Sequence, residues 1–467
     1  MQADVLEAAR AAFSRDPGRI TLGAVVHGGE CVAEPIASIP LPMMNRHGLI
    51  AGATGTGKTK SLQLIAEQLS AAGVPVLVSD VKGDLSGLGA AGEPSDRVNQ
   101  RARETGYFWR PEAAPVELLS LSGKLGAQLR ATVSSFGPLL LSKVLGLNET
   151  QTSVLTLVFK FCDDKGLLLL DFKDLRAVLQ YLAGDGADEL EAYGGMSKQT
   201  AGVLLREMVE LEAQGAEDFF GEPEFDLDDL MQTTPDGRGL VSLLELRDVQ
   251  DRPAMFSTFM LWMLARLYGQ LPEVGDVDKP KLVFFFDEAH LLFDGASKAL
   301  LGQIEQTVRL IRSKGVGVFF VTQSPRDVPP DVLGQLGNRV QHALRAFTED
   351  DDKALRAAAR TFPKTTFYDL EETLTTMGIG EALVSTLAAN GVPTQPFVVR
   401  MVPPSSRMAP LAEAELQQHL SASEQVAHYA QDVDRHSARE MLELRAAPAA
   451  AQPQAPPPPP PPPPGQP

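Results

Sequence analysis

The hydrophobic residues of this chain fall into two kinds of pattern: short unbroken apolar runs and longer stretches with helical spacing. The apolar runs are typical of strands buried on both faces, and they occupy residues 20–26, 49–51, 76–80, 282–286 and 318–322. Helical patterns lie between most of these runs. The alternation predicts an α/β fold built around a parallel sheet.

The last part of the predicted sheet is expected to contain a hairpin. Residues 339–344 form one strand candidate and residues 382–384 form a second. The Asn390-Gly391 turn would pair the second with residues 397–399, because this dipeptide favours tight hairpin turns.

The middle of the chain has a different character. From about residue 116 to 245 it is rich in leucine at helical spacing, and no strand alternation of comparable length is present. We interpret this region as a helical insertion between two parts of the α/β unit.

These patterns divide the chain into five parts. They are a short N-terminal helix and strand before the core (residues 1–45), the first part of the α/β core (46–115), the helical insertion (116–245), the rest of the α/β core (246–404) and a tail (405–467). The tail is expected to be helical at first and then disordered, because Pro456 to Pro464 form an uninterrupted polyproline run.

Composition narrows the class of protein. No apolar stretch reaches the roughly 18 to 20 residues of a membrane helix, and no secretory signal pattern is present at the N-terminus, so we expect a soluble, cytoplasmic protein. Cys31 and Cys162 are the only cysteines, which excludes a disulfide framework or a cysteine-based zinc site.

The net charge of −18 argues against a surface broadly adapted to nucleic acid. Any such contact must be local. One candidate region runs from Lys298 to Lys364, where eleven Lys or Arg residues face seven Asp or Glu residues, a local net charge of +4. An exposed, solvated helix face is the structural alternative for such a region, since these faces often carry charge of this kind.

The strongest chemical motif follows the strand expected at residues 49–51. It reads Gly52-Ala53-Thr54-Gly55-Thr56-Gly57-Lys58-Thr59. Its glycines allow a tight turn that aims backbone N–H groups at phosphates, and the positive end of the next helix adds to the attraction. Lys58 is expected to bind the β- and γ-phosphates of ATP, and Thr59 to bind Mg²⁺. A chance glycine-rich turn is the alternative, which the strand, loop and helix order disfavours.

Two later strands end in polar residues suited to hydrolysis. Asp287 follows the apolar strand at 282–286 and is expected to reach the magnesium shell, while Glu288 would polarise the attacking water. Gln323 ends the next strand and would hydrogen-bond the γ-phosphate or its water. A solvent-facing acidic strand end and a polar cap are the structural alternatives.

Together these residues resemble the HerA-like branch of the HerA and FtsK group of ATPases, and most closely its YjgR-type family. The matching segments are residues 47–59, 80–84, 136–138, 146–151, 286–290 and 317–325. The resemblance extends from about residue 20 to 404. HerA itself carries a substantial N-terminal β-barrel, whereas here only a short segment precedes the P-loop.

The resemblance implies a RecA-like core that assembles with itself as a ring, commonly a hexamer, with ATP between subunits and DNA as the track. In this group an arginine from the neighbouring subunit completes the site. Arg339 is the first candidate, with Arg309 and Arg312 behind it.

Three functions remain open at this point. The leading one is an ATP-driven ring motor on DNA; the others are an ATPase that moves or remodels protein, resembling the type IV secretion ATPases, and a nucleotide-dependent scaffold. The sequence does not identify a partner protein. The run Asp287-Glu288-Ala289-His290 also invites comparison with DEAH-type helicases, but those carry two RecA-like lobes and only one P-loop core is found here.

Overall fold

A single mixed sheet organises the molecule. The structure is a computed structural model, and it describes residues 2–13, 18–250, 252–275, 277–294, 298–431, 433 and 435–446. In this part of the chain the sheet has twelve strands, in the order β2-β1-β12-β11-β10-β3-β9-β8-β4-β7-β5-β6. The strands are β1 (Arg19–His27), β2 (Glu30–Pro40), β3 (Gly48–Ala51), β4 (Val76–Asp80), β5 (Val116–Ser120), β6 (Ala127–Gln128), β7 (Val241–Glu245), β8 (Leu282–Phe286), β9 (Val316–Thr322), β10 (Asn338–His342), β11 (Glu381–Ser385) and β12 (Phe397–Met401).

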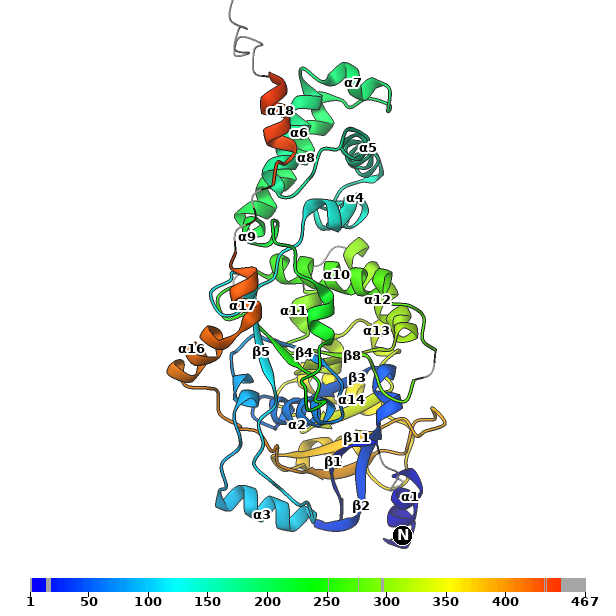
Figure 1. Ribbon diagram of the computed structural model, residues 1–467. Helices are drawn as coiled ribbons and strands as arrows, with labels where there is room; N and C mark the ends of the chain where they lie inside the picture. Colours follow the sequence, from blue (N-terminus) through cyan, green and yellow to red (C-terminus); the bar gives the residue numbers. More distant parts are fainter. Residues whose placement is uncertain are drawn as a thin grey trace, which may run out of the picture.

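Helices surround the sheet and extend from it (Figure 1). They are α1 (Gln2–Ala12), α2 (Lys58–Ala71), α3 (Asp96–Thr105), α4 (Val133–Val144), α5 (Glu149–Lys165), α6 (Phe172–Ala183), α7 (Ala187–Glu191), α8 (Lys198–Ala213), α9 (Ala216–Phe219), α10 (Pro253–Gln270), α11 (His290–Phe293), α12 (Lys298–Ile311), α13 (Pro330–Leu333), α14 (Glu349–Arg360), α15 (Leu370–Thr376), α16 (Glu413–Ala422), α17 (Glu424–Tyr429) and α18 (Ala438–Ala446). None of the described helices is both long and apolar enough to cross a membrane.

The centre of the sheet is parallel, as the apolar runs predict. Strands β10, β3, β9, β8, β4, β7 and β5 run in the same direction, so their carboxyl ends lie at one edge. Strands β1, β2, β11 and β12 extend the sheet in antiparallel pairs, including the expected β11–β12 hairpin.

Each face of the sheet is covered by helices, which explains why its strands have no polar face. In β8, Phe284 and Phe286 belong to the core shared with α10 and α12, whereas Val283 and Phe285 belong to the core shared with α2. Alternate side chains therefore enter opposite hydrophobic cores, and a strand buried in this way needs an apolar residue at every position.

The helical insertion is shorter than the sequence indicates. Residues 116–120 and 241–245, both inside the range expected to be helical, form β5 and β7 and pair in parallel with each other, with β7 also pairing with β4. The prediction was wrong for these two segments, because each short leucine-containing run was interpreted as part of the surrounding leucine-rich helical region. The helical part comprises α4 to α9 and projects beyond the carboxyl edge of the sheet (Figure 1).

The C-terminal helices connect the sheet with this projecting part. Helix α16 packs near β5 and α17 near β6, and α18 lies beside α6 (Figure 1). The Tyr429 hydroxyl donates to Asp229 at 2.6 Å, and Ala438 N donates to the Leu168 carbonyl at 2.9 Å. The expected helical tail is confirmed to residue 446, and the polyproline run lies outside the described residues.

Candidate functional site

The glycine-rich loop lies between β3 and α2, at the carboxyl edge of the sheet. Gly52 N donates to the Thr322 carbonyl at 3.2 Å and Ala53 N to the Ala343 carbonyl at 2.9 Å, so both neighbouring strands hold the loop. Gly52 has φ +152°, and a Cβ there would lie 2.5 Å from the Cβ of His342. The tight approach of the loop to β10 therefore requires glycine.

Lys58 begins α2 and folds back over the loop. Its ammonium donates to the Ala53 carbonyl at 3.2 Å, and the Thr56 hydroxyl donates to the same carbonyl at 2.7 Å. Burial lowers the pKa of Lys58, while the charges of Glu288 and Asp287 act in the opposite direction. The loop thus presents a partly desolvated cation where P-loops bind the β- and γ-phosphates.

Asp287 stands directly after β8 and is 4% exposed. Its backbone N–H donates to the Ser79 hydroxyl at 3.0 Å, which fixes the end of β8 against β4. Burial, followed by the nearby charge of Glu288, raises the pKa of Asp287 to about 7. The charges of Lys58 and Lys82 act on Asp287, but burial and the second acid outweigh them, and this arrangement suits a bound cation.

The available oxygen donors fit Mg²⁺ in the manner of P-loop proteins. Among the described residues no group of three or more His, Cys, Asp and Glu side chains could hold a metal by itself. Mg²⁺ at a P-loop needs no such group, because it takes one hydroxyl, one carboxylate and phosphate oxygens of the nucleotide. Thr59 would supply the hydroxyl and Asp287 the carboxylate.

Glu288 has an unusual backbone and a buried carboxylate. Its φ is +48°, in the left-handed region that few non-glycine residues adopt, and its side chain forms an ion pair with Lys82. The second carboxylate oxygen lies 3.5 Å from Nδ1 of His290 and has no hydrogen-bond partner. The turn after β8 therefore holds a buried carboxylate that has one unpartnered oxygen and whose charge acts on Lys58 of the P-loop.

Gln323 is exposed at the end of β9. It lines a recess of about 430 Å³ together with Ala53 of the loop and His290, which we call the Gln323 recess. The structure therefore brings Gln323 to the same side of the loop as the Glu288 turn. This position suits an amide that contacts a terminal phosphate or its attacking water.

Arg339 is placed away from the loop. It lies on β10, and its guanidinium donates to the carbonyls of Thr361 at 2.8 Å, Leu333 at 3.2 Å and Leu336 at 3.3 Å. The guanidinium of Arg339 is therefore occupied by contacts within its own subunit. This counts against the hypothesis that Arg339 reaches the site of a neighbouring subunit. Of the other candidates, Arg309 is exposed on α12 and Arg312 is half-buried after it.

Two residues at the site were missed by the sequence interpretation. Lys82 was noted only as part of a matching segment, and its pairing with Glu288 joins residues 206 positions apart. His342 is buried beneath the loop, where Nδ1 contacts the Glu381 carbonyl at 2.9 Å and Nε2 contacts the Ser61 hydroxyl at 2.8 Å. Neither partner could be read from local spacing.

The surroundings of His342 determine its protonation. A carbonyl can only accept, so Nδ1 must carry the proton and Nε2 must accept from Ser61. Burial lowers the pKa of His342 to about 4, which keeps the ring neutral near neutral pH. A neutral histidine thus ties β10 and β11 to the first turn of α2.

The raised pKa of Asp287 predicts a pH-dependent stability difference for Asp287→Asn. Between about pH 4 and 7 the folded wild type binds more protons than the unfolded chain, so ionisation of Asp287 costs stability as the pH rises. Without Mg²⁺, we expect the variant to match the wild type near pH 4 and to be more stable by about 1 to 3 kcal/mol at pH 8. Thermal unfolding across this pH range measures the difference.

The exposed Asp163 on α5 provides the matched control, since Asp163→Asn removes a carboxylate that is not buried. The difference in free energy of unfolding between Asp163→Asn and the wild type should not grow over the same pH range. An Asp287→Asn variant that is less stable than the wild type at pH 8 would contradict the conclusion that burial makes ionisation of Asp287 unfavourable.

Comparison with known families finds one match over most of the chain. Residues 30–460 match the family described as Helicase HerA-like C-terminal. No curated protein matches the sequence.

Several solved structures have a similar fold. The unbound bacterial conjugative coupling protein TrwBdeltaN70 is similar with a TM-score of 0.54 and 14% identity, over 89% of this chain and 94% of that one. The plasmid coupling protein TrwB in complex with the ATP analogue ADPNP gives a TM-score of 0.53 and 16% identity, over 86% and 98%. VirB4 of Thermoanaerobacter pseudethanolicus gives 0.50 and 16%, over 87% and 100%. These likenesses confirm the expected RecA-like P-loop fold.

Proposed function

This chain belongs to the Helicase HerA-like C-terminal family, and from that premise we propose that it is an ATP-hydrolysing motor that forms a ring and acts on DNA. The observation that carries the proposal is the meeting of four groups at one edge of the sheet. The P-loop, Asp287, Glu288 and Gln323 follow three adjacent parallel strands, β3, β8 and β9.

Under this proposal each group has a role in hydrolysis. Lys58 and the loop N–H groups would bind the β- and γ-phosphates, and Thr59 and Asp287 would hold Mg²⁺, whose charge would neutralise that of the phosphates. Glu288 would accept a proton from the attacking water, and its unpartnered carboxylate oxygen supports this role. Gln323 contacts the terminal phosphate or that water.

Self-assembly is part of the proposal because the Gln323 recess is open. Gln323 is exposed, and the same recess includes Asp294, Arg345 and Asp351. A terminal phosphate bound there would face solvent unless another surface covered it. A second copy of this chain, supplying an arginine, would complete the site, as in the ring ATPases that the sequence resembles.

DNA should stimulate ATP turnover, and the stimulation should fall as salt rises. Contacts between cationic side chains and phosphates release counterions, so their strength depends steeply on ionic strength. The measurement compares ATPase rates with and without single- or double-stranded DNA across a salt series, on material of known oligomeric mass. The same salt series without DNA is the control.

An ATPase that no DNA stimulates at low salt would overturn the DNA assignment while leaving hydrolysis intact. The net charge of −18 favours a protein substrate as the second candidate, because an acidic surface repels nucleic acid.

A further inference from the structure

One charged contact at the site is made by a residue to which the proposed mechanism gives no role. Lys82 follows β4, and its ammonium pairs with Oε1 of Glu288, the proposed proton acceptor. The other carboxylate oxygen, Oε2, has no hydrogen-bond partner among the described residues. The ion pair therefore leaves Glu288 with one oxygen that is held and one that is available.

The two partners of this ion pair differ in burial. The side chain of Glu288 is 7% exposed, whereas that of Lys82 is 52% exposed. A carboxylate taken out of water is costly, and a cation that contacts it offsets part of this cost. Lys82 can therefore hold Glu288 from the surface, and replacing Lys82 removes a contact without opening the hydrophobic core.

The turn that carries Lys82 is fixed by a carboxylate at the end of β4. Asp80 is the last residue of this strand and is buried. Its carboxylate accepts the backbone N–H groups of Gly83 at 2.7 Å, Asp84 at 3.3 Å and Leu85 at 2.8 Å. Because β4 pairs directly with β8, these hydrogen bonds give the backbone of Lys82 a defined position relative to the strand that precedes the Glu288 turn.

Residues that follow β7 hold the same turn from its other side. Gln250 donates to the Val81 carbonyl, and the Arg247 side chain lies over Gly83, where a Cβ would collide with it. Gly83 also has φ +73°, a conformation that favours glycine. Arg247 donates in turn to the buried carboxylate of Glu245 at 2.8 Å. Contacts from β4 and from the segment after β7 therefore fix the turn together.

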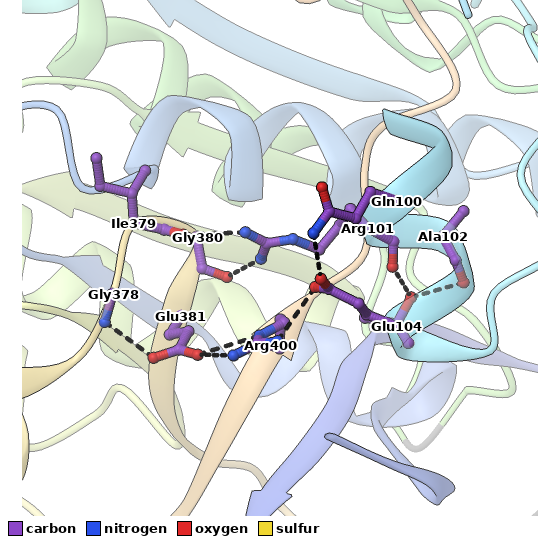
Figure 2. A network of polar contacts seen from close by, with 10 residues as sticks. Gln100, Arg101, Ala102, Glu104, Gly378, Ile379, Gly380, Glu381 and Arg400 are labelled. Atoms are coloured by element: carbon purple, nitrogen blue, oxygen red, sulfur yellow. Dashed lines mark hydrogen bonds and ion pairs between the residues drawn. The ribbon is translucent and has the colours of Figure 1, made fainter. Parts of the chain in front are cut away.

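The phosphate-binding loop is held by a different set of contacts. Gly380, before β11, donates its N–H to the Thr56 carbonyl at 2.9 Å. Figure 2 shows the Arg101 guanidinium of α3 at the Gly380 carbonyl, to which it donates at 3.0 Å, and Arg400 continues this network between α3 and β11. Lys82 takes part in none of these contacts, so its replacement should leave the loop in place.

We infer that Lys82 is a positioning residue for hydrolysis, which holds one oxygen of the Glu288 carboxylate so that the other oxygen faces the attacking water. The inference rests on the proposed function, because it requires Glu288 to accept the proton of that water. Lys82 acts through Glu288 and does not touch the nucleotide. The turn after β4 thereby joins a site whose other groups follow β3, β8 and β9.

Lys82→Met tests the inference, since methionine keeps much of the length of the side chain and loses its charge. The kcat for ATP hydrolysis should fall by about 10- to 100-fold, because a catalytic group that is no longer held in place loses its orientation. The KM for ATP should stay within about threefold of the wild type. Lys82→Arg can form the ion pair again and should recover most of the rate. A raised KM with an unchanged kcat would overturn the inference, because it would mean that Lys82 binds the nucleotide directly.

A double-mutant cycle with Glu288→Gln separates a positioning role from a direct one. If Lys82 acts through the carboxylate, adding Lys82→Met to Glu288→Gln should change single-turnover hydrolysis by less than about twofold. A further loss of about tenfold or more in that background would overturn the inference, since Lys82 would then act on the phosphate or on folding. The matched control is Lys165→Met, which removes an exposed lysine paired with Glu189 in the helical part and should leave kcat and KM unchanged.

The outcomes separate this inference from the proposed function. A wild-type kcat in Lys82→Met, or an equal loss in Lys82→Met and Lys82→Arg, would overturn the role of Lys82 and leave the ATPase assignment intact. A wild-type protein that does not hydrolyse ATP would overturn the proposed function and this inference with it.

Discussion

Lys58→Ala is expected to abolish ATP turnover, with a loss of at least about a hundredfold, comparable to removing a donor that stabilises transition-state charge. The ammonium already lies over the loop at the Ala53 carbonyl, so alanine removes the positive charge from the phosphate site itself. Folding should not suffer, because burial makes this charge unfavourable in the absence of phosphate. Steady-state ATPase rates and thermal unfolding measure the two effects.

Lys160→Ala is the matched control for Lys58→Ala. Lys160 is an exposed lysine on α5 that pairs with Asp164, far along the chain from the P-loop. Its replacement should leave turnover unchanged. If Lys58→Ala folds normally and retains wild-type turnover, the P-loop is not the hydrolytic site.

Glu288→Gln is expected to retain ATP binding and lose hydrolysis by about a hundredfold or more, because an amide of the same size cannot accept the proton of the attacking water. The ion pair with Lys82 is lost at the same time, but Lys58, Thr59 and Asp287 remain. Nucleotide affinity by calorimetry and single-turnover hydrolysis distinguish binding from chemistry.

Glu273→Gln provides the comparison, since Glu273 also pairs with a lysine, Lys314, but lies on the exposed surface. That variant should hydrolyse ATP at the wild-type rate. Full single-turnover activity in Glu288→Gln would remove Glu288 from the proposed role and direct attention to Gln323 or a residue of another subunit.

Sequence reasoning succeeded for residues whose position depends on one strand and the loop that follows it. The run at 282–286 needs apolar side chains on both faces, so it identified β8, and with it the position of Asp287 and Glu288. Local order alone determines this relation, as it does for β3, the P-loop and α2.

Contacts between distant segments could not be predicted in the same way. Strands β5 and β7 are recognisable only from their pairing in the sheet, β5 with β7 and β7 with β4, since each is a short run in a leucine-rich region. The position of Lys82 depends on β4 lying beside β8, and that of His342 on β10 lying beside β3. Arg339 was chosen for its charge, whereas its guanidinium binds carbonyls of its own subunit.

The C-terminal helices restrict how the helical part can move relative to the sheet. The helical part α4 to α9 is joined to the sheet by the segments after β6 and before β7, and the tail adds a further attachment through Tyr429 and the Ala438–Leu168 hydrogen bond. Pivoting of the helical part about its two covalent connections would stretch this attachment. Any displacement of α6 relative to the sheet would therefore also displace the C-terminal helices, which pack against β5 and β6.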